Sequence, residues 1–164
     1  LTKAPDMTKT NALSSINAIF KGCTSLVDAP VIPDSVLDMS EAFLGDSNIY
    51  TASAFPESVE DISSAYADCI SLEKAASIPA SVINCDSCYS GCSNLYGELS
   101  INTNTEDCAN LLSNAVTSGK TLKLKGKSGR LFEIQQDSGS RYVTIKDTEK
   151  AEKNAKKLER QNNQ

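Results

Sequence analysis

Apolar and polar positions along this chain repeat with a period of 23 residues. The longest apolar column runs through Ile32, Phe55, Ile78, Ile101 and Leu124, and Ile145 follows 21 residues later. A second column is aromatic and comprises Phe20, Phe43, Tyr66 and Tyr89, with Leu112 continuing the series. Such a fixed period is typical of repeat proteins, in which each unit buries its apolar face against its neighbours. We therefore expect the aromatic column to stack as a buried ladder.

Each repeat predicts the same succession of elements. Leu26–Ile32 has the pattern of a strand, and Pro33 ends it because proline cannot donate to a strand ladder. A turn follows, and then a short helical stretch such as Met39–Leu44, with Ser40 near its N-cap and Gly45 where it would stop. This succession predicts six or seven short parallel strands, one per repeat.

The two ends of the chain depart from the regular repeat. Leu1 to Met7 match Leu26 to Ile32 with a shift of 25 residues, so the first repeat has two extra residues. Because Leu1 falls at the start of a repeat, we expect the chain to come from a longer array or to lack a capping segment. Residues 121–125 and 141–146 alternate as strands, and 128–136 can form a short helix.

The domain prediction is one unit over residues 1–146, in which 117–146 are divergent capping repeats, followed by a polar tail at 147–164. The tail contains three apolar side chains, Ala151, Ala155 and Leu158. This is too little to offset the cost of ordering the segment, so we expect a marginal helix or disorder.

The repeat motif resembles the BspA-like leucine-rich repeat. The segments that carry the resemblance are Phe-Lys-Gly-Cys-Thr-Ser-Leu at 20–26 and Ile-Pro-Asp-Ser-Val at 32–36, and residues 89–95 repeat the first of them. It covers residues 1–116 well and 117–146 weakly. Asp46 stands where the pattern has Cys, Asn102 where it has Pro, and Thr105 where it has Val.

The resemblance implies both a fold and a setting. The implied fold class is an α/β solenoid, a leucine-rich-repeat-like right-handed superhelix of strand, turn and short-helix coils with a short parallel sheet. Members of this family are typically surface or secreted proteins of bacteria, several of them adhesins, and similar repeats occur in protist surface proteins and phage-encoded proteins. We accordingly expect an extracellular or cell-surface location.

Charge is divided unevenly along the chain. Residues 1–119 carry 4 basic and 15 acidic side chains, a net of −11, whereas 120–164 carry 12 basic and 6 acidic, a net of +6. The acidic majority disfavours nucleic acid as a partner, since phosphate binding needs a basic face. We interpret the basic end as a solvated cap, which is the usual reason for a run of charge. No run of 18 apolar residues is present, so membrane insertion is not expected.

Catalytic chemistry is poorly supported. The chain has no histidine, which removes Ser–His and Cys–His nucleophile pairs, and we predict no enzymatic activity. Cys85, Cys88 and Cys92 have zinc-like spacing but fall in repeat columns, so we interpret the six cysteines mainly as small buried apolar residues, with no metal or cofactor. The alternative is a disulfide between stacked repeats, Cys69–Cys92 or Cys85–Cys108.

The best candidate for a binding site is the outward face of the strand positions. The candidate ligand-binding residues on it are Tyr50, Glu73, Tyr96, Glu98 and Lys123. Exposed tyrosine is a good contact residue, although these rings could instead cover neighbouring apolar surface. The predicted function is a monomeric, non-catalytic interaction module, adhesin-like, that binds a protein or glycan ligand on a host or neighbouring cell. The alternatives are a structural spacer and a phage-particle recognition protein. A binding module should gather exposed aromatic residues on one face, and a spacer should not.

Overall fold

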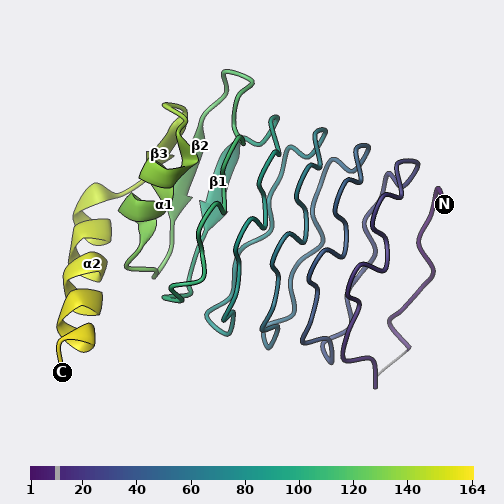
Figure 1. Ribbon diagram of the computed structural model, residues 1–164, viewed down its shortest axis with the longest axis horizontal. Coiled ribbons are helices and arrows are strands. Elements are labelled where there is room, and N and C mark those ends of the chain that lie inside the picture. Colours follow the sequence, from purple (N-terminus) through teal and green to yellow (C-terminus); the bar gives the residue numbers. More distant parts are fainter. Residues whose placement is uncertain (10–11) are drawn as a thin grey trace.

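The computed structural model describes residues 1–9 and 12–164. Its regular elements are β1 (Gly97–Ser100), β2 (Leu122–Lys125), α1 (Leu131–Ser138), β3 (Val143–Ile145) and α2 (Thr148–Asn162). The strands form one parallel sheet in the order β1-β2-β3. Figure 1 shows this sheet and both helices at the C-terminal end, next to a row of stacked turns of chain that extends to the N-terminus.

The predicted fold class, an α/β solenoid of strand, turn and short-helix coils, is wrong. The part of the chain that the structure describes has two helices, both beyond residue 130, and one three-stranded parallel sheet that is neither curled nor closed. The predicted six or seven strands are therefore also wrong. Before β1, neighbouring repeats are joined by isolated parallel bridges, for example Lys3 with Asp28 and Thr51 with Lys74. The first of these bridges has the 25-residue offset expected for the first repeat.

Residues 15–116 form layers of turns that are held together by backbone hydrogen bonds. In the first layer the amide of Ile16 donates to the carbonyl of Asp38 at 2.9 Å, and the amide of Phe20 donates to that of Ala42 at 2.9 Å. The same set of bonds, each joining residues 22 apart in the sequence, starts again at Met39, Ile62 and Cys85. The sequence period thus sets the length of chain in each of the layers seen side by side in Figure 1.

Two recurring left-handed residues in each layer explain why no helix forms there. The first is Ala18, Glu41, Ser64, Ser87 or Asn110, with φ between 54° and 59°, and the second, four residues later, is Gly22, Gly45, Asp68, Gly91 or Asn114, with φ between 59° and 78°. A left-handed residue interrupts a right-handed helix, so the predicted helix at 39–44, which contains Glu41, is wrong. Alternate amides instead bond back three residues, as Lys21 does to Ala18 at 3.2 Å, and leave the others free to reach the next layer. Ser40 caps no helix, because its amide and hydroxyl both donate to Asp38 Oδ1, at 2.9 and 2.6 Å.

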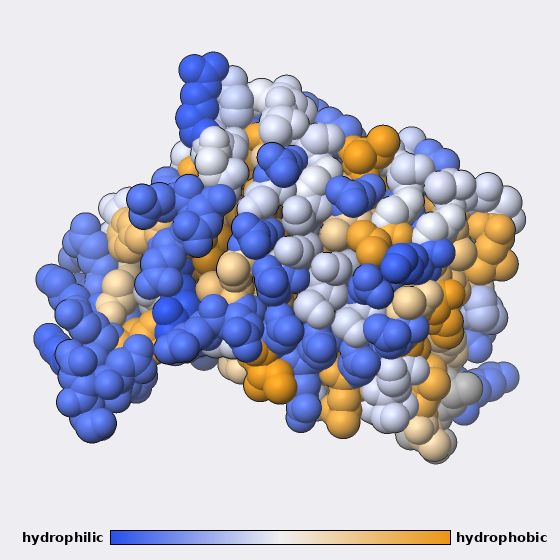
Figure 2. All heavy atoms as spheres, viewed as in Figure 1, coloured by the Kyte–Doolittle hydropathy of each residue, from blue (hydrophilic) through white to orange (hydrophobic). Residues whose placement is uncertain are grey.

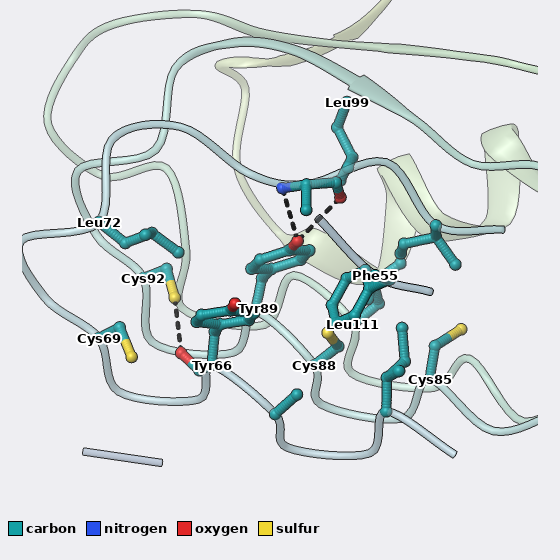
Figure 3. Close-up of a cluster of buried hydrophobic side chains, with 14 of the residues drawn as sticks. Phe55, Tyr66, Cys69, Leu72, Cys85, Cys88, Tyr89, Cys92, Leu99 and Leu111 are labelled. Atoms are coloured by element: carbon teal, nitrogen blue, oxygen red, sulfur yellow. Dashed lines mark hydrogen bonds between the residues drawn. The ribbon is translucent and has the colours of Figure 1, made fainter. Parts of the chain in front are cut away.

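The aromatic ladder is confirmed. Phe20, Phe43, Tyr66 and Tyr89 are each at most 2% exposed, and successive rings stack with centroids 5.4, 4.9 and 5.7 Å apart. The Tyr89 hydroxyl donates to the carbonyl of Ala76 and accepts from its amide, both at 2.8 Å, as Figure 3 shows. This pair of bonds satisfies the polar end of a fully buried ring.

Pairing in the sheet differs from the simple period. Leu124 lies opposite Leu99, 25 residues earlier, and not opposite Ile101 as the 23-residue column predicts. The 21-residue step from Leu124 to Ile145 is confirmed. Relative to the 23-residue period, the step from β1 to β2 is therefore two residues longer, and the step from β2 to β3 is two residues shorter. Gly126 takes up the change at the end of β2, where its φ is 108° and a Cβ would lie 2.4 Å from the Ile101 carbonyl oxygen.

Of the two states expected for residues 147–164, the structure has the helix. Asp147 caps α2 by accepting from the amide of Lys150 at 3.0 Å. Ala151 and Leu158 are buried, at 3% and 9% exposure. The helix lies close to the loop before α1, since a Cβ on Gly129 would come within 2.7 Å of Leu158 Cβ. α2 thus closes the C-terminal end of the layers.

Candidate functional site

Three of the predicted site residues come together in adjacent layers. The amide of Glu73 donates to the carbonyl of Tyr50 at 2.8 Å, and the amide of Tyr96 donates to that of Glu73 at 3.1 Å. The Tyr96 hydroxyl donates to Glu73 Oε2 at 3.3 Å, and the Lys120 ammonium lies 4.4 Å from the centre of the Tyr96 ring. We call Tyr50, Glu73, Tyr96 and Lys120 the tyrosine row.

Apolar surface borders the Tyr50 end of this row. Tyr50 is 52% exposed and Val27, one repeat earlier, is 45% exposed. Both line a shallow hollow of about 200 Å³ with the backbone of residues 28–29 and 51–53. A second hollow of about 310 Å³ lies beside Val31, which is 69% exposed, and Phe55. The exposed tyrosine therefore stands at a hollow lined by both apolar and polar residues.

The other two predicted site residues lie opposite each other on the sheet. Glu98 is paired in register with Lys123, and Lys123 with Thr144. A 23-residue step would place Glu98 beside Thr121, and the two-residue shift in register places it beside Lys123 instead. Lys123 is exposed. Lys123 lies on β2 and makes none of the contacts of the tyrosine row.

Glu98 holds together a small charge cluster. Its carboxylate accepts from Lys146 Nζ at 2.6 Å and from Lys125 Nζ at 2.9 Å. Donation by Lys146 first, and then by Lys125, lowers the pKa of Glu98 to about 2. Sequence reasoning missed both lysines and Lys120. The signals available for the first two were the alternation of charge at 123 and 125 and the end of the last strand at 146. Lys120 lies two 23-residue steps after Lys74, in a column without apolar residues.

Five of the six cysteines are buried as expected, and Cys23 is half-buried. All six are free thiols, so neither Cys69–Cys92 nor Cys85–Cys108 is bonded in this structure. Cys69 Sγ donates to the carbonyl of Phe43 at 3.1 Å, and Cys92 Sγ to that of Tyr66 at 3.0 Å, as Figure 3 shows for the second pair. Burial raises the pKa of Cys69 and of Cys85 to about 12, which disfavours the thiolate that nucleophilic or metal-binding chemistry needs.

Asp46 occupies the same repeat column as Cys23, Cys69 and Cys92. It is fully buried, and neither oxygen of its carboxyl group has a hydrogen-bond partner among the described residues. Burial raises the pKa of Asp46 to about 7, an effect that the nearby amide of Cys23 partly offsets. Within residues 1–9 and 12–164, Asp46 belongs to no group of three or more acidic or sulfur side chains that could hold a metal ion.

Comparison of the chain with protein-family models, with curated proteins and with solved structures finds no match. None of the helices in the described residues is long and apolar enough to cross a membrane. The site therefore has to be interpreted from its own geometry.

Proposed function

We propose that the protein is a non-catalytic interaction module that binds a protein or glycan on a host or neighbouring cell through the tyrosine row. The observation that carries this proposal is the division of its nine aromatic residues. Seven belong to the core or pack against it: Phe20, Phe43, Phe55, Tyr66, Tyr89, Phe132 and Tyr142. The other two, Tyr50 and Tyr96, stand two layers apart on one face.

The tyrosine row combines the features that recognition uses. Tyrosine offers a broad apolar ring with a hydrogen-bonding hydroxyl and few torsions to immobilise, and such rings can lie against the apolar face of a sugar or a peptide. Glu73 and Lys120 hold Tyr96 from two sides, so that little freedom remains to be lost on binding. A spacer gains nothing from this grouping, which is why the binding function is preferred.

The surface setting of this proposal rests on the resemblance to BspA-like repeats. Surface or secreted proteins are typical of that family, and several of its members are adhesins. The phage alternative rests on the same resemblance and on no feature of the tyrosine row.

The test is a double substitution, Tyr50→Ala with Tyr96→Ala, assayed on a panel of immobilised extracellular-matrix proteins and host-surface glycans. Loss of both rings should lower affinity for any ligand that binds the wild type by at least about tenfold, as for aromatic hot spots. The control, Ile70→Ala with Ile83→Ala, removes two apolar side chains outside the row, which are 52% and 59% exposed, whereas Tyr50 is 52% exposed and Tyr96 is half-buried. Equal losses in the two variants, or none in the first, would refute the assignment to the tyrosine row.

A further inference from the structure

A basic hollow lies at the C-terminal end of the molecule, away from the tyrosine row. Its volume is about 390 Å³, within the range of small-ligand pockets. It forms where β1 and β2 end, where the chain leaves β3, and where α2 begins (Figure 1). Parallel strands end at the same edge of a sheet, so segments far apart in sequence contribute side chains to one place.

The side chains around this hollow are strongly positive. Lys125, Lys127, Lys146 and Lys150 line it with a single acid, Asp147, a formal balance of +3 in a protein whose net charge is −5. The Asp147 carboxylate is already engaged in capping α2. The N-terminal end of α2 adds further positive potential, because helix dipoles favour anions there. Figure 2 shows hydrophilic side chains gathered over the α2 end of the molecule.

Glu98 shows what these lysines can bind. Lys125 and Lys146 converge on its carboxylate at 2.9 and 2.6 Å. The geometry of two ammonium groups around one oxyanion is thus already present beside the hollow. Lys127 and Lys150 form no ion pair within the described part of the chain, which leaves two ammonium groups for an anion from outside.

The loop that carries Lys127 is held firmly. The amide of Lys127 donates to Asn102 Oδ1 at 2.9 Å, and the amide of Ser128 donates to the carbonyl of Ile101 at 2.9 Å. Asn154 of α2 donates to the carbonyl of Gly126 at 3.3 Å. These bonds fix the backbone of the loop against both β1 and α2, so that the lysines approach the hollow from a preorganised frame.

We propose that this hollow binds a sugar-sized ligand that carries oxyanion groups, with Lys127 and Lys150 as its main contacts. Lys125 and Lys146 are shared between the ligand and Glu98. Leu131 and Ala151 also line the hollow, but they are only 2% and 3% exposed, so the lysines supply the contacts. Sulfate, phosphate and carboxylate groups present the same charged oxygens, so the shared chemistry is an acidic sugar. The proposal is independent of the tyrosine row.

The experiment is a calorimetric titration of the protein with glucose 6-sulfate, glucose 6-phosphate and glucuronate, each against neutral glucose. At least one acidic sugar should bind, with an affinity that falls as salt is raised, and glucose should not. Which of the three binds identifies the source of the oxyanion. No binding by any acidic sugar at 10 mM, on the order of the weakest affinity of interest, would overturn the proposal.

Three variants test the location of the site. Lys127→Gln with Lys150→Gln should weaken binding about tenfold or more, since each substitution removes a charge-assisted hydrogen bond. Lys156→Gln with Lys157→Gln makes the same change in net charge on α2, away from the hollow, and should leave affinity within about twofold at 0.15 M salt. Equal losses in the two double variants would show general charge attraction and overturn the assignment.

Glu98→Gln supplies the opposite change. It frees Lys125 and Lys146, so the affinity for the acidic sugar that binds should rise several-fold. An unchanged or lower affinity would exclude these two lysines from the site. A melting curve of each variant shows whether the fold is retained, and loss of binding in a variant with unaltered melting then reports on the site alone.

Discussion

Replacing Asp46 should stabilise this protein, and by an amount that depends on pH. A buried carboxylate without hydrogen-bond partners is costly, because it has lost its water and gained nothing in exchange. Asp46 comes close to this position when it ionises, since it is fully buried without a hydrogen-bond partner among the described residues and the nearby amide of Cys23 offsets only part of the cost. Asn has nearly the same shape as Asp and carries no charge, so Asp46→Asn removes the cost of burying the charge, while the amide remains a buried polar group at every pH.

The size of the effect follows from linkage between protonation and folding. The pKa of Asp46 rises from 3.8 to about 7 on folding. An acid whose pKa is raised in the folded state does not lower the free energy of unfolding below its unfolded pKa. The loss of stability grows as the pH rises toward the folded pKa and is complete above it. A rise of this size corresponds to about 4 kcal/mol when complete. Between pH 5 and pH 8 the penalty should grow by about 2–3 kcal/mol.

The composition of the chain leaves few other groups that titrate between pH 5 and pH 8 in the folded protein. There is no histidine, the side chain that ordinarily titrates between pH 5 and 8. The pKa of Glu98 is about 2 and those of Cys69 and Cys85 are about 12, all outside the window. The thiols of the unfolded chain begin to ionise near pH 8 in the wild type and in the variant alike, so the assignment to Asp46 rests on the difference between the two proteins.

The assay is urea denaturation of the wild type and of Asp46→Asn at pH 5 and pH 8. The difference in free energy of unfolding, variant minus wild type, should be greater at pH 8 than at pH 5 by about 2–3 kcal/mol. Using the difference between two pH values cancels any packing effect of the amide. An advantage of the variant that is the same at both pH values would show that the carboxyl group is solvated or paired, and would refute the reasoning.

A second variant tests why cysteine suits this column. Cys69 and Cys92 each donate a thiol hydrogen to a carbonyl 26 residues earlier. In Asp46→Cys the equivalent acceptor is the carbonyl of Phe20. A thiol can donate a hydrogen bond to this carbonyl, whereas a carboxylate has no hydrogen to donate. Asp46→Cys should match or exceed the gain of Asp46→Asn at pH 8, and a stability below that of the wild type at pH 8 would contradict the equivalence of the layers.

Three further predictions concern packing. Phe43→Ala should lower the free energy of unfolding by about 3–5 kcal/mol in chemical denaturation, the usual range for a core aromatic, because its ring is stacked on both faces. Tyr50→Ala, at an exposed position, should change it by less than about 0.5 kcal/mol. Similar losses for both variants would refute the ladder as a stabilising element. Deleting residues 147–164 should lower the melting midpoint by more than about 5 °C, since α2 buries Ala151 and Leu158, and a smaller drop would mean that the helix is only loosely attached. Gly129→Ala should expose α2 to proteolysis, because its Cβ would lie 2.7 Å from Leu158 Cβ, and resistance equal to that of the wild type would show that the close approach is easily relaxed.

The period and the core could be predicted from the sequence, whereas the secondary structure of the layers could not. Apolar columns such as Ile32, Phe55 and Ile78 record which side chains face the core, and these residues are buried. A period carries no information about how the amides pair. Here alternate amides bond within a turn and between layers, through left-handed residues such as Ala18 and Glu41, which are not typical of that conformation. Tertiary pairing overrode the local preference for helix.

The candidate site could be predicted only where the period is unbroken. Tyr50, Glu73 and Tyr96 follow the 23-residue spacing and do lie in adjacent layers. Glu98 and Lys123 do not follow it, because they lie on the strands where two residues are gained, and the 23-residue columns misplace them relative to each other.

The same shift in register brings together lysines that are spread along the sequence. Along the sequence, Lys125, Lys127, Lys146 and Lys150 are scattered among polar residues, and nothing in that order distinguishes a shared site from separate exposed side chains. The steps of 25 and 21 residues between the strands bring the ends of β1, β2 and β3 to one edge, and α2 begins directly after it. Like charges placed so close repel one another, and Glu98 relieves only Lys125 and Lys146. The remaining pair, Lys127 and Lys150, is the part of this edge where an external oxyanion gains most.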